Sequence, residues 1–75
     1  MNNALKIAFA ATLKKYRVRK NLSQEDLSFA CGITRAHLSD LENGQIDPGF
    51  YTVFKIANGL KMKASDFIDA IEHEL

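Results

Sequence analysis

Apolar side chains recur at helical spacing along most of the chain, and no stretch alternates apolar and polar residues for long enough to predict a strand. The residues Leu5, Phe9, Leu13 and Tyr16 lie three or four positions apart, which predicts a first helix over about residues 4–20. Asn21 follows this helix, and asparagine tolerates the left-handed backbone that often ends one. The whole pattern predicts an all-α fold of five short helices.

The second predicted helix is short and begins at a capping residue. Ser23 precedes Gln-Glu-Asp, and acids in the first turn of a helix are favoured by its dipole. This helix runs to about Cys31 and stops at Gly32. Because glycine permits a sharp reversal of the backbone, the turn Cys31-Gly32-Ile33 predicts a steep angle to the next helix.

The third predicted helix begins after Thr34, which serves as its cap, and Asn43-Gly44 ends it. Leu38 and Leu41 fall on its buried side, whereas its other positions are polar and mixed in character. A pair of helices with this spacing is typical of units that place the second helix in the major groove of DNA.

Two further helices are predicted in the last third of the chain. Asp47-Pro48-Gly49 indicates a turn, and Pro48 suits the first position of a helix. The fourth helix carries apolar residues on more than one face, and the fifth begins at about Ala64. Together they hold more apolar residues than one small core needs, which predicts a surface for a second copy of the chain. The residues expected in that dimer interface are Phe50, Tyr51, Phe54 and Ile68.

Size and composition narrow the class of protein. A chain of 75 residues predicts one domain, residues 1–75, near the lower size limit for folding without stabilising disulfides. The single cysteine excludes an intramolecular disulfide. No apolar run is long enough to cross a bilayer, and no segment has the order of a secretory signal, so we expect a cytoplasmic protein.

The net charge of +1 hides an asymmetry along the chain. Residues 1–45 contain seven Lys/Arg and four Asp/Glu, whereas residues 46–75 contain three Lys/Arg and five Asp/Glu. Local positive charge permits phosphate binding. An ordinary solvated surface explains the distribution equally well, so charge alone does not predict a DNA-binding protein.

The stretch from Leu13 to about Phe67 resembles the phage-repressor or Cro/C1-type (XRE) helix-turn-helix family. The resemblance depends on many positions in register: Arg17, Leu22-Ser23-Gln24-Glu25, Leu27, Gly32, Leu38, Leu41-Glu42-Asn43-Gly44, Pro48 and Ile56-Ala57. It implies a lambda-repressor-like DNA-binding domain in a transcriptional regulator, with no enzymatic activity, cofactor or metal. The compact length and the last helix also resemble the controller proteins of restriction–modification systems.

The resemblance also implies roles for individual residues. Residues that would face the DNA bases are Arg35, Ala36, His37, Ser39 and Asp40. Residues that would hold phosphates are Ser23, Gln24, Thr34, Asn43 and Gln45. Arg17 and Glu42 resemble the family's structural ion pair, so we assign Arg17 to the fold and not to DNA. Ala36 offers only a methyl group, which limits reading there to contact with a thymine methyl.

The predicted partners are double-stranded DNA and a second copy of the chain. The expected site is a palindromic operator, with the helix over about residues 34–43 in the major groove. RNA polymerase is a further candidate partner, blocked or recruited at a nearby promoter. The alternative is an antitoxin or another protein-interaction module built on the same fold.

Cysteine and histidine residues could in principle serve redox chemistry or metal binding, but their positions in the sequence do not favour either role. Cys31 as a redox sensor is less favoured than Cys31 in the core, because buried thiols behave as small hydrophobes. His37, His73 and Cys31 lack metal-ligand spacing. Phe29 and Ala30 are apolar where the family usually has charged residues, so they either extend the core or form a small contact patch.

Overall fold

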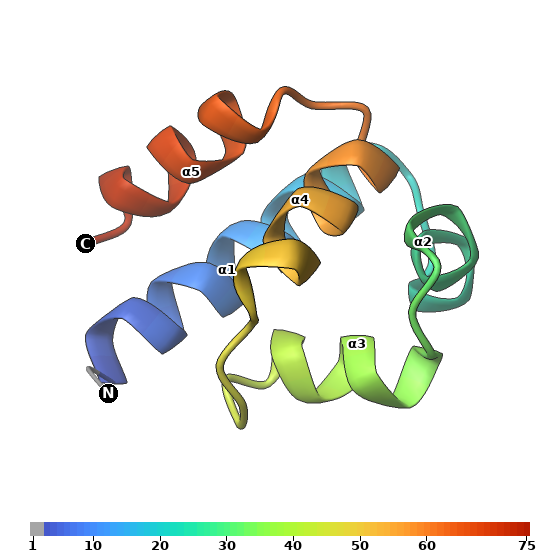
Figure 1. The fold of residues 1–75 in the computed structure, drawn as a ribbon, viewed down its shortest axis with the longest axis horizontal. Helices are drawn as coiled ribbons and strands as arrows, with labels where there is room; N and C mark the ends of the chain where they lie inside the picture. The colour runs from blue at the N-terminus through green and yellow to red at the C-terminus, as the bar shows by residue number, and fades with distance from the viewer. Residues whose placement is uncertain (1–2) are drawn as a thin grey trace.

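The computed structural model describes residues 3–75, and in that range the chain forms five α-helices and no strand. Their bounds are α1 Asn3–Arg19, α2 Gln24–Cys31, α3 Arg35–Glu42, α4 Phe50–Gly59 and α5 Ala64–His73. Figure 1 shows α1 and α4 running through the middle of the molecule, with α5 packed on one side and α3 on the other. The all-α prediction is therefore confirmed.

The helix ends follow from local sequence. Asn21 and Lys61 adopt left-handed backbone, with φ of 58° and 59°, which is uncommon for residues other than glycine. Ser23 accepts a hydrogen bond from the backbone N–H of Asp26, and the Asp26 carboxylate accepts one from the backbone N–H of Ser23. This reciprocal capping box fixes the start of α2.

The start of α4 differs from the sequence prediction. Pro48 does not occupy the first helical position, because α4 begins at Phe50 and Gly49 is its N-cap. Gly49 supplies no side-chain hydrogen bond to the helix. The start of α4 therefore lacks a capping side chain, and a pattern of local signals misplaces it.

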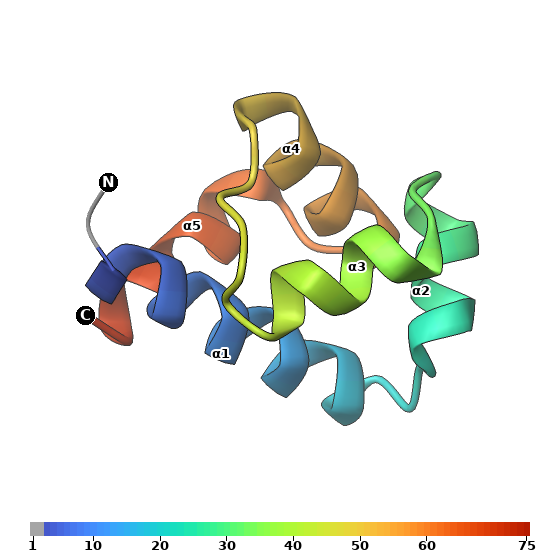
Figure 2. The same ribbon diagram turned by 90° about the horizontal axis from the view of Figure 1, so that it is seen from below.

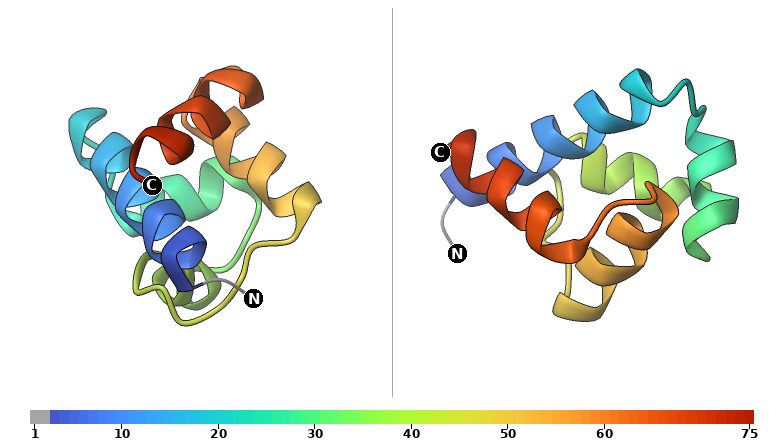
Figure 3. Two further views of the ribbon diagram at one scale, coloured as in Figure 1. Left: turned by 90° about the vertical axis from the view of Figure 1, so that its left-hand side faces the viewer. Right: turned by 90° about the horizontal axis from the view of Figure 1, so that it is seen from above.

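The core lies where all five helices meet. Leu27, Leu38, Leu41, Ile56, Leu60 and Phe67 are buried together with Phe9 and Leu13 of α1. The Phe9 and Phe67 rings pack edge to face, with centroids 5.9 Å apart. Figure 3 shows the start of α1 and the end of α5 at the same end of the molecule, away from α2.

Several apolar residues do not join this core. Leu5, which shares the predicted apolar spacing of α1, is 41% exposed. Phe29 is 90% exposed and Ala30 is also exposed, so the interpretation of these two as added core is wrong. Cys31, by contrast, is buried against α4.

Candidate nucleic-acid interface

The helix predicted to read DNA forms one outer surface of the molecule. Figure 2 shows α3 across the front of the molecule, with no other helix over its near side. Its inner side is buried through Leu38, Leu41 and Glu42. Arg35, Ala36 and Asp40 are exposed, whereas His37 and Ser39 are half-buried.

The turn before α3 fixes the direction of that helix. Gly32 is left-handed, with φ of 73°, and its N–H donates to the Ser28 carbonyl oxygen at 2.9 Å. Lys55 of α4 donates from Nζ to the Gly32 carbonyl oxygen at 3.1 Å. The Thr34 hydroxyl then accepts a hydrogen bond from the backbone N–H of His37, which caps α3. The turn is therefore held by glycine backbone geometry, a cap and a contact from α4.

The first residue of α2 lies beside the first turn of α3. One shallow depression is lined by Gln24, Arg35, Ala36 and Ser39. A neighbouring one is lined by Arg17, Ser23, Gln24, Glu25 and Arg35. The structure thus brings Gln24 together with three of the predicted base readers on one surface. His37, Asp40, Asn43 and Gln45 line neither depression.

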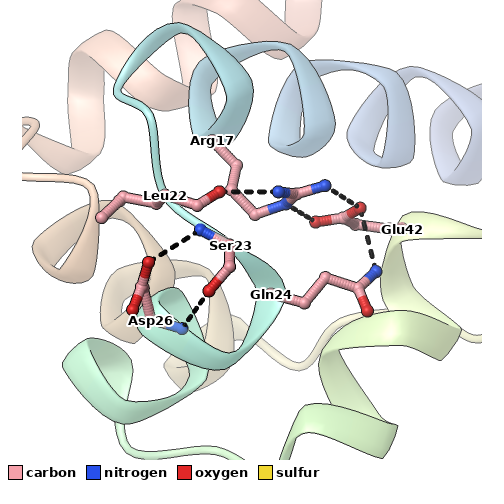
Figure 4. A network of polar contacts seen from close by, with 6 residues as sticks. All are labelled: Arg17, Leu22, Ser23, Gln24, Asp26 and Glu42. Carbon is pink, nitrogen blue, oxygen red and sulfur yellow. Dashed lines mark hydrogen bonds and ion pairs between the residues drawn. The ribbon is translucent and has the colours of Figure 1, made fainter.

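A buried carboxylate behind this surface joins three helices (Figure 4). Arg17 of α1 forms a bidentate ion pair with Glu42 of α3, with Nη2 at 3.1 Å from Oε1 and Nε on Oε2. Arg17 Nη1 also donates to the Leu22 carbonyl oxygen at 2.7 Å. The Glu42 side chain is 3% exposed and the Arg17 side chain 13%. The predicted contact between Arg17 and Glu42 is therefore present and largely shielded from water.

Sequence reasoning missed the third member of this network. Gln24 Nε2 donates to Glu42 Oε1 at 3.2 Å, so the residue predicted to meet a phosphate also contacts the ion pair. Gln24 and Glu42 are 18 residues apart, and no local pattern links an amide to a carboxylate at that distance. Only the packing of α2 against α3 reveals the contact.

Two ionisable groups of α2 have shifted pKa values, Asp26 near its start and Cys31 at its end. Hydrogen bonding to Ser23, chiefly from its backbone N–H, lowers the pKa of Asp26. Burial raises the pKa of the Cys31 thiol, which opposes formation of the reactive thiolate. The Ser23 hydroxyl, predicted to hold a phosphate, is already the acceptor in the capping box.

A second surface of the molecule is apolar and lies on α4 and α5. Phe50 is 77% exposed, and Tyr51, Phe54 and Ile68 are also exposed. The rings of Phe50 and Phe54 pack at 4.9 Å between centroids. A groove of about 370 Å³ runs beside Phe50, lined mainly by apolar side chains: Leu5, Phe9, Pro48, Val53, Ile68 and Ile71.

The described residues contain neither a candidate metal site nor a candidate membrane-spanning helix. Within residues 3–75, no cluster of three or more His, Cys, Asp or Glu side chains could hold a metal ion. In the same range, no helix is long and apolar enough to cross a membrane.

The capped α2, the glycine turn and the exposed polar face of α3 together define a DNA-binding helix-turn-helix protein. Residues 13–67 match the model of the helix-turn-helix family HTH_3. The chain belongs to this family, and the resemblance inferred from the sequence is confirmed.

The relatives include control proteins and regulators of transcription. Over 70 residues, 92% of this chain and 86% of the relative, the chain is 31% identical to the control protein C.BamHI of Bacillus amyloliquefaciens. It is 41% identical to the uncharacterized HTH-type transcriptional regulator MJ0272 of Methanocaldococcus jannaschii over 54 residues, 72% of this chain and 82% of the relative. Neither relative is named as an enzyme.

A solved structure agrees with the same classification. The restriction–modification controller protein C.AhdI of Aeromonas hydrophila superposes with a TM-score of 0.79 at 29% identity, covering 83% of this chain and 94% of that one. The protein is therefore a helix-turn-helix transcriptional regulator with controller-protein homologues.

Proposed function

We propose that residues 1–75 act as one sequence-specific DNA-binding domain that inserts α3 into the major groove. The observation that carries this proposal is the exposed surface at the start of α2 and α3, where Gln24, Arg35, Ala36 and Ser39 line one shallow depression. An α-helix fits the major groove, and base contacts come from its exposed side chains. Likeness to controller proteins supports a role in regulating a restriction–modification system.

The residues that we expect to contact DNA divide into two roles, and only some of them line this surface. Arg35 is the chief base reader, because its long guanidinium offers the bidentate donors that guanine O6 and N7 accept. The remaining base contacts come from Ala36, His37, Ser39 and Asp40. Phosphates are held by Ser23, Gln24, Thr34, Asn43 and Gln45, which position the protein without reading sequence.

The regulator acts as a homodimer on a palindromic operator. A single reading helix contacts too few base pairs to select one site in a genome. A symmetric dimer doubles the contacts and requires half-sites roughly 34 Å apart, one turn of DNA. The exposed Phe50, Tyr51, Phe54 and Ile68, next to the apolar groove, are the proposed contact surface. Such an apolar patch on a small protein is typical of an interface.

The regulatory outcome follows from occupancy of DNA. A dimer bound over a promoter blocks RNA polymerase, and one bound beside it recruits polymerase. We expect the protein to act in the cytoplasm of its cell.

The direct test is selection of bound sequences from random duplex DNA with the full chain. The expected result is a single motif with two inverted half-sites about one helical turn apart. An enriched motif without a two-fold centre would contradict the dimer, and no enrichment would contradict sequence-specific binding.

A second function, protein interaction of the antitoxin kind, is favoured by one observation. Phe29 is 90% exposed on the outer side of α2, away from the core. A pull-down from the native host separates the two functions, because a stable protein partner lost in Phe29→Ser would favour the antitoxin.

A further inference from the structure

The Glu42 carboxylate has one more partner than an ion pair requires. Its Oε1 atom accepts from Arg17 Nη2 at 3.1 Å and from Gln24 Nε2 at 3.2 Å. Figure 4 shows the Gln24 amide nitrogen turned toward Glu42 and the amide oxygen turned away. One end of this side chain is therefore anchored to a buried group, whereas Gln24 itself lines both surface depressions at the start of α3.

We propose that Glu42 is a positioning residue for DNA binding, because it holds the Gln24 side chain in the orientation that meets a DNA phosphate. The proposal rests on the DNA-binding function proposed above. An amide nitrogen carries two hydrogens. One is used on Glu42, and the other is left for a phosphate oxygen.

The hydrogen bond from Gln24 to Glu42, here called the anchor, lowers the conformational entropy that Gln24 loses when DNA binds. A free glutamine has several rotamers, and fixing them on association weakens binding. A charged acceptor shielded from water makes a stronger hydrogen bond than an exposed one. The Glu42 side chain is 3% exposed, so water competes little for its oxygens. Arg17 neutralises the carboxylate, and the anchor therefore does not repel the phosphate.

The test must remove the anchor without unfolding the protein. Replacing both members of a buried ion pair by apolar residues of similar volume is often neutral or stabilising, whereas removing one leaves a buried charge. The double variant Arg17→Met/Glu42→Met therefore keeps the net charge and removes the acceptor of Gln24. Four proteins are compared: the parent, Gln24→Ala, the methionine pair and the triple variant. Each is checked by circular dichroism and titrated onto random-sequence duplex DNA at one salt concentration.

We expect Gln24→Ala and the methionine pair, Arg17→Met/Glu42→Met, to remove the same contribution to DNA affinity. Gln24→Ala and the methionine pair each weaken binding, roughly two- to tenfold for one hydrogen bond, and the triple variant is no weaker than Gln24→Ala. Losses that multiply in the triple variant would overturn the proposal, because Glu42 or Arg17 would then act independently of Gln24. Unchanged binding by Gln24→Ala would also overturn it. A parent protein that binds no duplex DNA would instead refute the proposed function itself.

A second measurement uses the parent protein alone, so it does not depend on whether any variant folds. The chain has two glutamines, Gln24 and Gln45, and only Gln24 contacts a carboxylate in the structure of residues 3–75. Side-chain amide relaxation by NMR in the free protein should show a rigid Gln24 and a mobile Gln45. Equal mobility of the two amides would overturn the anchor.

Discussion

Gly59 of α4 lies so close to Cys31 of α2 that a Cβ atom at position 59 would be 2.9 Å from the Cβ of Cys31. It would also lie 3.2 Å from the Cys31 backbone nitrogen, which no side-chain rotation can relieve. This contact sets how near α4 comes to the helix-turn-helix unit. The absence of a side chain at position 59 is therefore a requirement of packing.

Gly59→Ala should destabilise the protein, because α2 and α4 must separate to admit the methyl group. Overpacking of this kind costs about 1–3 kcal/mol. The measurement is urea unfolding followed by circular dichroism. Asn58→Ala, at an exposed neighbouring position, is the control and should stay within about 0.5 kcal/mol of the parent. Equal stability of Gly59→Ala and the parent would show that the helices move apart freely.

Glu42→Ala should cost far more than the loss of a surface ion pair. It leaves the Arg17 charge in a shielded position without its partner, a loss of about 3–5 kcal/mol. That approaches the whole stability of a small domain, roughly 5 kcal/mol. Glu74→Ala is the control, because it breaks the exposed pair between Lys15 and Glu74 and should cost less than about 1 kcal/mol. Similar melting temperatures for the two variants would contradict a structural role for the buried pair.

The contribution of the capping box to stability should decrease at acidic pH. The folded-state pKa of Asp26 is lowered below 3.8, chiefly by the Ser23 backbone hydrogen bond. A lowered folded pKa means that the carboxylate's contribution to stability is present above pH 3.8 and is lost as the pH falls through the folded pKa. Asp26→Asn should therefore melt below the parent at neutral pH and approach it in acid. Melting temperatures between pH 2 and 7 test this, with Glu72→Gln as the control. A constant gap between Asp26→Asn and the parent would exclude the linkage.

Arg35→Ala should reduce sequence preference and leave the fold intact. Loss of a bidentate base contact costs about 1–3 kcal/mol of specific binding. Binding to the selected operator and to random duplex DNA is compared for Arg35→Ala and for Arg19→Ala. Arg19 is an exposed arginine of α1 whose guanidinium lies over the Tyr16 ring, so its loss removes the same charge elsewhere. If Arg35→Ala weakened both DNAs equally, Arg35 would be a phosphate contact.

Charge placed on the apolar surface of α4 and α5 should separate the dimer. Phe50→Glu and Ile68→Glu put a carboxylate into the proposed interface, and sedimentation at micromolar concentration should change from dimer to monomer. Phe29→Glu alters an exposed phenylalanine on α2 and should leave the dimer unchanged. A monomeric parent under these conditions would refute the dimer model.

The helices, most of their ends and the helix-turn-helix unit are predictable from local patterns in the amino-acid sequence. These features depend on contacts within a few residues. Ser23 and Asp26 are three residues apart in the capping box, and Gly32 supplies the left-handed backbone of the turn. Such contacts form wherever the residues are neighbours in the chain, so a pattern of residue types is enough to predict them.

Which apolar residues are buried, and which distant polar groups meet, depends on how the helices pack in three dimensions. Leu5 fits the same helical spacing as Phe9, yet it is exposed and lines the open groove beside Phe50. The contact of Gln24 with Glu42 spans 18 residues, and the approach of Gly59 to Cys31 joins two helices separated by α3. Helical periodicity gives each helix an inner face, but the distance and angle between helices arise from packing all side chains at once.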